Sequence, residues 1–371
     1  MLRQNQVMVD LKAICHNYAL LRQSLPKAAR VMAVVKADAY GHGMVPVARA
    51  LSELGVVDFA VALVEEGIAL REGGVAGQVL VLGAAMECAA EEAVRHELTQ
   101  TVFTPQMVAC LEREALRQGK DALVHIKLDT GMNRIGLRTA KEADELAAAL
   151  RVAPHVRPMG IYTHFADADR PLPSGEINEY TRMQLERFQA LRAHFDASIP
   201  AHAANSAMSL LAPEASFSMV REGIALYGYP PVKTALALCP ALRWVTEVVY
   251  LKELEAGETI GYGRTFTAPR AMRIATVAVG YGDGYHRQLS NCGQMLVCGR
   301  RANIVGLVCM DQTMLDVTEI PDVRIGSQVV LLGEQGGECI NAEALASWAQ
   351  TISYEVLLAI TARVPKTYLN A

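Results

Sequence analysis

The 371-residue sequence lacks the long apolar runs that a membrane protein would need. No stretch reaches the roughly 18 uninterrupted apolar residues of a membrane-spanning helix, and the start of the chain has no apolar segment of signal-peptide length. The chain also lacks an excess of charge of one sign, because 35 basic and 39 acidic residues leave a formal net charge of −4. Since no basic run is present either, we expect no nucleic-acid partner and no membrane partner.

Closely spaced cysteine pairs are absent as well. The eight cysteines are scattered, and no two of them form a Cys-x-x-Cys pair. This argues against zinc ribbons and thioredoxin-like sites, and we expect no bound metal. In a chain without an export signal, such cysteines are typical of reduced thiols in a protein core. The sequence therefore predicts a cytoplasmic protein.

The sequence does contain enough apolar material for a large packed core. Hydrophobic residues make up 51% of the chain and charged residues 20%, which is typical of a well-packed globular protein. At 371 residues, the chain exceeds the length at which a single core usually stops growing. We therefore expect two domains.

In the first part of the chain, short apolar runs alternate with segments of helical length. One helical candidate is Pro105–Gln118, which begins with proline and is followed by glycine, and another is Ile177–Phe195. Eight strand–helix units predict an α/β fold with a closed (β/α)8 barrel of the TIM type. An open doubly wound sheet is the alternative, but the Gly-x-Gly-x-x-Gly fingerprint of dinucleotide binders is absent after the first run. The eight apolar runs are Val31–Lys36, Phe59–Leu63, Val79–Leu82, Thr101–Phe103, Leu123–Leu128, Met159–His164, His202–Asn205 and Met219–Arg221.

The pattern changes after Tyr229-Pro230-Pro231. From there on, strand-like runs are separated by glycine-rich turns, and the one clear helix is near Ala342–Ala349, after a plausible Asn341 cap. We therefore place a domain boundary near residue 232, with a barrel domain at 1–232 and a predominantly β domain at 233–371. The strand-like runs are Glu247–Leu251, Arg273–Val279, Gln294–Val297, Ala302–Val308 and Gln328–Leu332.

The first apolar run ends in Lys36 and reaches a Gly-His-Gly turn within seven residues. A lysine that is desolvated shifts toward its neutral, nucleophilic form, which is the state that a Schiff-base lysine requires. The alternative is a lysine at a strand end whose amine reaches solvent. The run alone does not decide between the two.

Other polar residues also stand where the expected barrel strands end. In a closed barrel these ends meet at one rim, which is where such barrels carry their active sites. An amine, guanidinium groups, imidazoles and glycine-exposed amides would then lie together and suit an anionic ligand that bears a carbonyl group. Taken singly, each residue could equally be a solvated strand end, a core histidine or an ordinary turn. The residues are Lys36, Lys127, Asp129, Arg134, His164, His202, Asn205, Ser206, Arg221 and Gly223.

The segment Ala33–Gly43 resembles the cofactor-attachment signature of the alanine racemases. The resemblance runs along nearly the whole chain and implies a barrel plus a β domain, assembled as a head-to-tail homodimer. It also implies a pyridoxal 5'-phosphate enzyme that racemises L-alanine to D-alanine for peptidoglycan. The further matching segments are Lys127–Gly136, Thr163–Ala166, Asn205–Ala207, Arg221–Gly228, Gly261–Thr265, Gly280–Tyr285, Cys309–Gln312 and Ile352–Glu355.

By this resemblance, two residues act as acid and base on opposite faces of the substrate. Lys36 binds the cofactor covalently and is one base, and Tyr262 of the other subunit is the second. A tyrosine ordinarily has a pKa near ~10 and needs help to act as a base at neutral pH. The resemblance implies that this help comes from His164, supported by Arg221, and that His202 supports Arg221 in turn.

The resemblance also implies how the rest of the ligand is held. Arg221 faces the cofactor ring nitrogen, Lys127 is a candidate for carbamylation, and Tyr281 lines the entry channel. The cofactor-binding residues implied are Lys36, Tyr40, His202, Asn205, Ser206, Arg221, Gly223, Ile224 and Tyr354. The substrate-binding residues implied are Arg134, Met310 and Asp311.

Three other functions compete with an alanine racemase. A racemase of the same fold that prefers serine, lysine or a broad set of amino acids is the nearest, although Tyr281 and Tyr354 favour a narrow entrance. A non-catalytic carrier of pyridoxal phosphate predicts neither a second domain nor Tyr262. A related decarboxylase fits the Cys309-Met310-Asp311 segment less well.

Overall fold

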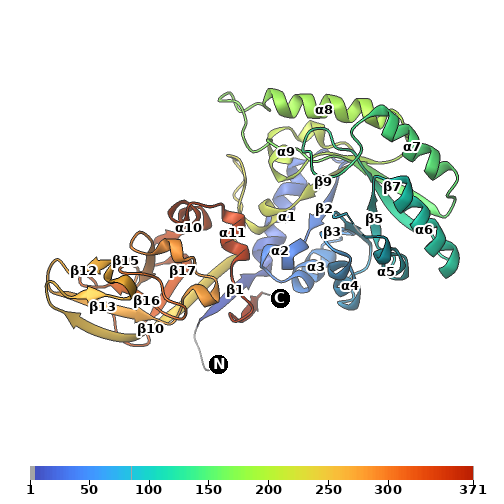
Figure 1. Cartoon of the computed structure of the whole chain (residues 1–371). Helices are drawn as coiled ribbons and strands as arrows, with labels where there is room; N and C mark the ends of the chain where they lie inside the picture. Colours follow the sequence, from blue (N-terminus) through green and yellow to red (C-terminus); the bar gives the residue numbers. More distant parts are fainter. Residues whose placement is uncertain (1–4, 85, 371) are drawn as a thin grey trace. The chain divides into compact units, whose positions relative to one another are not determined.

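A computed structural model describes residues 5–84 and 86–370, and these form two compact units (Figure 1). The expected domain ends at residues 1 and 371 lie outside the described part. The barrel unit comprises Ile14–Ala39 and Met44–Cys239. The β unit comprises residues 5–13, Tyr40–Gly43 and 240–370.

The barrel unit is built on eight parallel strands in the order β8-β7-β6-β5-β4-β3-β2-β9. A parallel bridge between Asn205 and Arg221 joins the two ends of this order and closes the barrel. The expected (β/α)8 architecture is therefore confirmed. The strands are β2 (Arg30–Val34), β3 (Asp58–Val61), β4 (Gln78–Val81), β5 (Thr99–Val102), β6 (Ala122–Lys127), β7 (Val156–Tyr162), β8 (Ala201–His202) and β9 (Met219–Glu222).

Helices follow the barrel strands, and α6, α7 and α8 lie along the outer side of the strands (Figure 1). The expected helix Pro105–Gln118 is α6, capped by the Thr104 side chain and ended by the left-handed Gly119. The expected helix Ile177–Phe195 is shorter, because Asn178 caps α8. The helices are α1 (Leu11–Ser24), α2 (Lys36–Tyr40), α3 (Met44–Glu53), α4 (Val64–Glu72), α5 (Ala90–Arg95), α6 (Pro105–Gln118), α7 (Ala140–Arg151), α8 (Glu179–Arg192) and α9 (Ser206–Leu211). Short 3-10 turns are η1 (Glu87–Ala89), η2 (Pro213–Ser216) and η3 (Ile224–Tyr227).

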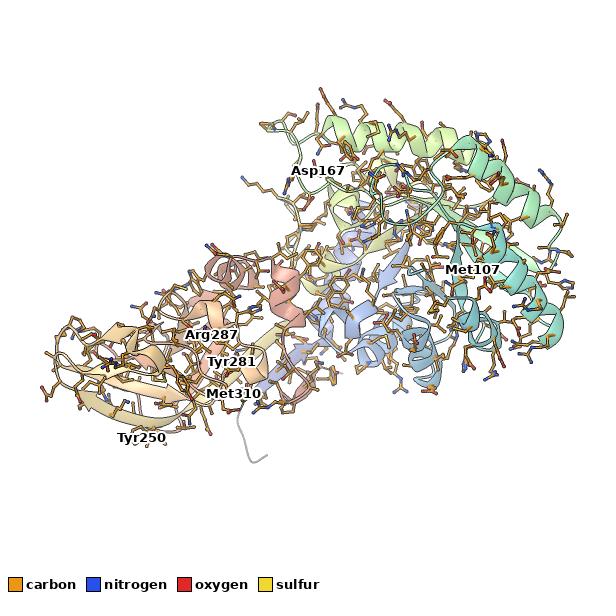
Figure 2. The ribbon with its side chains drawn as sticks, in the orientation of Figure 1. Met107, Asp167, Tyr250, Tyr281, Arg287 and Met310 are labelled. Atoms are coloured by element: carbon orange, nitrogen blue, oxygen red, sulfur yellow. The ribbon has the colours of Figure 1, made fainter. Side chains whose placement is uncertain are left out.

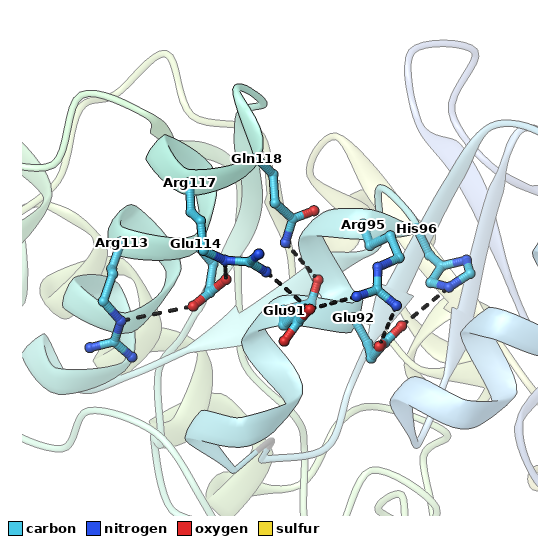
Figure 3. A network of polar contacts seen from close by, with 8 residues as sticks. All are labelled: Glu91, Glu92, Arg95, His96, Arg113, Glu114, Arg117 and Gln118. Carbon is cyan, nitrogen blue, oxygen red and sulfur yellow. Dashed lines mark hydrogen bonds and ion pairs between the residues drawn. The ribbon is translucent and has the colours of Figure 1, made fainter.

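The outer surface of α5 and α6 carries a network of ion pairs that links the two helices (Figure 3). Glu91 contacts Arg95 on its own helix at 2.5 Å and Arg117 on α6 at 3.0 Å. These side chains are about half exposed. The network is therefore a feature of the helical shell and lies apart from the buried strands.

The β unit contains a closed antiparallel barrel. Its nine-stranded sheet has the order β18-β17-β14-β15-β16-β13-β10-β1-β19, and the additional pairing of β17 with β10 closes six of these strands into a ring. The 13-residue strand β10 makes this possible, because different parts of it pair with β1, β13 and β17. The strands are β1 (Gln6–Asp10), β10 (Leu242–Leu254), β11 (Thr259–Ile260), β12 (Phe266–Thr267), β13 (Met272–Val277), β14 (Gln294–Val297), β15 (Arg300–Ile304), β16 (Thr313–Asp316), β17 (Gln328–Gln335), β18 (Glu338–Ile340) and β19 (Lys366–Leu369).

The remaining elements of the β unit are short. The expected helix after Asn341 is α10, and the Asn341 side chain accepts a hydrogen bond from the Ala344 amide. The helices are α10 (Ala342–Ala349) and α11 (Ser353–Leu358). The 3-10 turns are η4 (Tyr262–Arg264), η5 (Tyr281–Asp283) and η6 (Arg287–Leu289).

The structure differs from the expected division of the chain at its start. Strand β1 lies in residues that we expected in the barrel domain, yet it pairs with β10 and β19 of the β unit. The physical reason is that Val7 and Val9, which are fully buried, complete the core of this sheet. A pairing between strands so far apart in the sequence cannot be predicted from the local pattern of apolar and polar residues.

Two features of residues 5–84 and 86–370 bear on function. No helix there is long and apolar enough to cross a membrane. The same residues contain no group of three or more His, Cys, Asp or Glu side chains that could hold a metal ion.

Candidate active site

Lys36 follows β2 directly, and the end of that strand is firmly held. The Val35 amide donates to the Ala60 carbonyl at 2.8 Å, and the Tyr227 hydroxyl donates to the Val34 carbonyl at 2.8 Å. The Lys36 side chain is partly buried. Burial lowers the pKa of its amine, and the nearby charge of Arg134 lowers this pKa further. The amine is thus shifted toward the neutral form that can act as a nucleophile or base.

The backbone after Lys36 turns in an unusual way. Ala37, Asp38 and Ala39 have φ values of 51°, 53° and 55°, which place all three in the left-handed helical region. This conformation costs about 1–2 kcal/mol per residue for residues other than glycine. The turn is closed by the Ala39 amide, which donates to the Val35 carbonyl, and by the Asp38 carboxylate, which accepts from the Met44 amide. Lys36 is therefore presented by a defined loop.

Arg221, on β9, is the centre of the buried polar cluster. Its side chain is almost fully buried, and its two terminal nitrogens donate to the imidazole nitrogens Nδ1 of His202 at 2.9 Å and of His164 at 3.2 Å. They also donate to the carbonyl oxygens of Thr163, His202 and Ala203. Burial lowers the pKa of Arg221 to about 10, so the guanidinium keeps its charge at neutral pH. In the described part of the chain, no hydrogen bond uses Nε–H, which leaves this donor for a ligand.

The arginine fixes the direction of a hydrogen-bond chain across the barrel interior. Because a guanidinium only donates, His202 must accept at Nδ1 and carry its proton on Nε2. That Nε2 lies 2.9 Å from His125 Nδ1, so His125 accepts there and carries its own proton on Nε2. The side-chain amide nitrogen of Gln78 is placed 2.9 Å from His125 Nε2. Because His125 Nε2 carries a proton, we assign the amide the opposite orientation, in which its oxygen accepts from His125.

Both imidazoles of this chain are neutral. Burial and the charge of Arg221 lower the pKa of His125 to about 3, and they lower that of His202 well below its ordinary value. Tyr162 supports the arrangement, because its ring stacks on His202 at 4.8 Å between centroids. The Arg221 guanidinium lies 5.2 Å from the same ring, in the position of a cation–π contact.

His125 is a site residue that we did not expect from the sequence. A signal was present, since His125 and Lys127 stand two apart on one strand and must face the same side of it. The His125 ring fits because Gly160 lies beside it; a Cβ at that position would come within 2.5 Å of the ring.

His164 is held in one tautomer by the same arginine. Its Nδ1 accepts from Arg221, so its proton is on Nε2. Burial and the charges of Arg221 and Arg134 lower the pKa of His164 well below its ordinary value. A neutral imidazole therefore offers an N–H donor on its other side.

Lys127 is a buried amine with an abnormal titration. Its Nζ donates to the Leu128 carbonyl at 2.8 Å and lies 5.1 Å from the centre of the Tyr162 ring. Burial and the charge of Arg221 lower its pKa to about 7. Burial thus shifts Lys127 toward its uncharged form.

Arg134 is exposed on the loop that follows β6. The Asp129 carboxylate shapes this loop by accepting from the amides of Gly131 and Asn133 at 3.1 and 2.9 Å. Tyr180, on α8, is 41% exposed, and its hydroxyl donates to the Gly131 carbonyl. The charge of Arg134 lowers the pKa of Lys36, Lys127 and His164, so its guanidinium is within electrostatic reach of all three.

Two helix starts meet beside Arg221 and form a candidate anion site. Ser206 opens α9, and its hydroxyl accepts from the Gly223 amide at 2.9 Å. Ile224 opens η3, so its amide has no acceptor within that turn. The Asn205 side chain caps α9 by accepting from the Met208 amide. A hydroxyl and backbone amides at the starts of helical turns are groups that bind a phosphate in proteins.

Six residues singled out in the sequence belong to the β unit. Tyr40 is buried there beside Tyr354, with 6.0 Å between the ring centroids. Met310 and Tyr281 lie on adjacent loops, joined by bonds from the amides of Tyr281 and Gly282 to the carbonyls of Cys309 and Met310 (Figure 2). The residues of this unit are Tyr40, Tyr262, Tyr281, Met310, Asp311 and Tyr354.

Several residues of this group present their side chains to solvent. Tyr262 is 71% exposed and Met310 53% exposed. Asp311 pairs with Arg363 at 2.7 Å. Among the described residues of the β unit, no hydrogen bond or ring contact joins Tyr262 to another expected site residue of that unit.

Comparison with known proteins identifies the family. Residues 9–231 match the model of the alanine racemase N-terminal domain, and residues 241–368 match that of the alanine racemase C-terminal domain. An alanine racemase from Symbiobacterium thermophilum is 47% identical over 99% of this chain and 97% of its own length. One from Halothermothrix orenii is 42% identical over 98% and 96%.

Solved structures agree with this result. The crystal structure of alanine racemase from E. faecalis has a TM-score of 0.92 and 36% identity, and it covers 99% of this chain and 98% of its own. That of alanine racemase from Bacillus anthracis with bound L-Ala-P has the same TM-score and identity, over 100% and 96%. The resemblance noted in the sequence is therefore confirmed, and this chain belongs to the alanine racemase family.

Proposed function

We propose that this protein is an alanine racemase that uses pyridoxal 5'-phosphate to interconvert L- and D-alanine. The observation that supports the proposal is a set of three groups in the barrel unit of a chain that belongs to this family. It contains a Lys36 amine whose pKa is lowered, an Arg221 Nε–H without a hydrogen bond in the described part of the chain, and a hydroxyl–amide anion site. These three groups fit the aldehyde, the ring nitrogen and the phosphate of the cofactor, respectively.

When bound, the cofactor withdraws electrons from the α-carbon of an amino acid and makes its α-proton acidic. The Lys36 amine would hold the aldehyde carbon, and Arg221 Nε–H would donate to the ring nitrogen. Because arginine cannot give up its proton, Arg221 would donate to an unprotonated ring nitrogen, and this would disfavour transamination. Ser206, Gly223 and Ile224 would hold the phosphate, and the remaining proposed holders are Tyr40, His202, Asn205 and Tyr354.

Racemisation requires an acid and a base on opposite faces of the α-carbon. Lys36 Nζ takes or returns the proton on one face, and Tyr262 Oη of a partner subunit does so on the other. His164 supports this role, because its Nε2–H would donate to the tyrosine oxygen and stabilise the deprotonated form. The exposed position of Tyr262 is consistent with a function that is completed by a second copy of the chain.

The substrate carboxylate would be bound by Arg134 and by the partner's Met310 and Asp311 loop, with Tyr281 at the entrance. A forked guanidinium suits a carboxylate. The neutral fraction of Lys127 would react with carbon dioxide, and the resulting carbamate would orient Arg134. We further propose a cytoplasmic homodimer that supplies D-alanine for peptidoglycan.

The test is to incubate the cofactor-loaded protein with L-alanine and to measure D-alanine with a D-amino-acid oxidase assay. We expect D-alanine to form until the two enantiomers are equal in amount. The same assay with L-serine and L-lysine measures selectivity. Bound cofactor without D-alanine formation would refute the proposal, and faster turnover of serine or lysine would reassign the substrate.

A further inference from the structure

The carboxylate of Glu66, on α4, joins two loops at the rim of the barrel. Its Oε2 accepts from the amides of Ala62 and Leu63 at 2.7 and 3.2 Å, which caps the start of its own helix. Its Oε1 accepts from the Ala37 amide at 2.6 Å. The first two bonds are an ordinary helix cap, and the third is an additional contact 29 residues away in the sequence.

The additional bond acts at the residue that follows Lys36. Ala37 opens the left-handed turn, a conformation that is unfavourable for residues other than glycine. A hydrogen bond to a charged acceptor is about twice as strong as one between neutral groups. Glu66 therefore ties the strained turn after β2 to the rigid start of α4.

The charge of Glu66 also acts on the amine itself. Among the groups around Lys36, the guanidinium groups of Arg134 and Arg221 lower its pKa, whereas the carboxylate of Glu66 raises it. The effect of Glu66 on the pKa of Lys36 is thus opposite in sign to the effects of burial and of the two arginines.

We propose that Glu66 is a positioning residue that holds the Lys36 turn and thereby aims the amine. Glu66 is not among the site residues that we expected from the sequence. The inference rests on the proposed function only in that Lys36 is the reacting amine, and the geometry of the turn can be tested without any reaction.

The first experiment measures hydrogen exchange of cofactor-free protein in peptides covering residues 31–43. Glu66→Ala removes all three bonds, and Glu66→Gln removes the charge while keeping one oxygen. We expect exchange in the turn to be about tenfold faster in Glu66→Ala, with a smaller increase in Glu66→Gln. Glu65→Ala and Glu65→Gln are the matched controls, because Glu65 is the exposed neighbour on the same helix. Equal exchange in the Glu66 and Glu65 variants would overturn the proposal.

The second experiment measures the acidity of Lys36 in the same protein. Acetic anhydride labels neutral amines, and mass spectrometry of the Lys36 peptide gives the fraction labelled at each pH. Removing the negative charge in Glu66→Gln destabilises the ammonium form, so the midpoint should move to lower pH. An unchanged or higher midpoint contradicts the assignment. Neither outcome depends on racemase activity, so failure of the proposed function is detected separately by the wild-type alanine assay.

A third variant distinguishes an effect of Glu66 on the orientation of Lys36 from a general effect on folding. Glycine adopts the left-handed conformation without a clash, so Ala37→Gly should relieve the need for support. We expect Glu66→Gln to lower kcat about tenfold and the double variant Glu66→Gln/Ala37→Gly to regain part of this loss. If the double variant is no more active than Glu66→Gln, while thermal unfolding shows both to be folded, Glu66 does not act through the turn.

Discussion

The two units hold their polar site residues in opposite ways. In the barrel unit, Arg221, His202 and His125 are buried and bonded to one another, and burial shifts their pKa values. In the β unit, Tyr262 and Met310 stand largely in solvent. The first set is joined by hydrogen bonds within the barrel unit, whereas the side chains of the second set are exposed in the described part of the chain.

This difference separates two kinds of site residue. A buried, directional set can define protonation states by itself, because each donor determines the tautomer of the next acceptor. An exposed tyrosine keeps its ordinary surroundings and gains a catalytic role only from a neighbour. We therefore expect substitutions in the two units to differ in what they damage.

The largest effect is expected from Lys36→Ala. Loss of both the cofactor attachment and one proton-transferring group should reduce D-alanine formation by at least about 10⁴-fold. Borohydride treatment followed by peptide mass mapping should attach cofactor to the Lys36 peptide of the wild type and to no peptide of the variant. Attachment to another lysine in the wild type would remove Lys36 from the mechanism.

Tyr262→Phe should reduce activity by about 10²–10⁴-fold while changing little else. Because the side chain is exposed, the free energy of unfolding should stay within about 0.5 kcal/mol of the wild type. Cofactor binding should persist. Activity assays and urea denaturation measure the two quantities, and a large loss of stability would mean that Tyr262 is structural.

Mixing these two variants sharpens the comparison between the units. If each active site takes Lys36 from one chain and Tyr262 from another, random hybrid dimers contain one intact site, and the mixture should regain about a quarter of wild-type activity. A mixture that stays inactive after subunit exchange, verified with tagged chains, would place both residues in the same chain.

The sequence predicted the barrel well because its strands are short apolar runs that end in polar residues. It did not predict β1, whose partners lie more than 200 residues away. It also missed His125, which stands inside an apolar run, and Glu66, whose role depends on a contact between loops. The local spacing of apolar residues predicts whether a segment is a helix or a strand. It does not predict which polar side chains come into contact after folding.

The sequence also did not predict the left-handed turn after Lys36. Alanine has no preference for positive φ, so Ala37 and Ala39 gave no signal for it. The segment Ala33–Gly43, which contains them, indicated the family. The structure shows that this segment forms a left-handed turn directly after Lys36.

Lys127→Met tests how far burial controls titration in the barrel unit. The folded pKa of about 7 lies below the unfolded value, so the unfolded chain binds more protons between these two pKa values. Wild-type stability should therefore rise with pH above 7, with Lys127 contributing at most about 1.4 kcal/mol per pH unit, and the variant should lack this contribution. Urea denaturation in bicarbonate-free buffer measures the slope.

Bicarbonate provides the control for this prediction. If the neutral amine forms a carbamate, added bicarbonate should stabilise the wild type and leave Lys127→Met unchanged, since only the wild type has the amine. A slope that is identical in the two proteins would show that Lys127 titrates normally in the folded state.

The smallest effect is expected at the surface of the same unit. Glu91 pairs with Arg95 and Arg117 in the network between α5 and α6 (Figure 3), and these side chains are about half exposed, unlike the buried Arg221. Water screens such pairs, so Glu91→Gln should lower the thermal midpoint by no more than about 2 °C, and added salt should remove even this difference. A larger, salt-resistant shift would mean that contact between α5 and α6 depends on these pairs. In that case, burial would no longer be the property that distinguishes the site from the surface of the barrel unit.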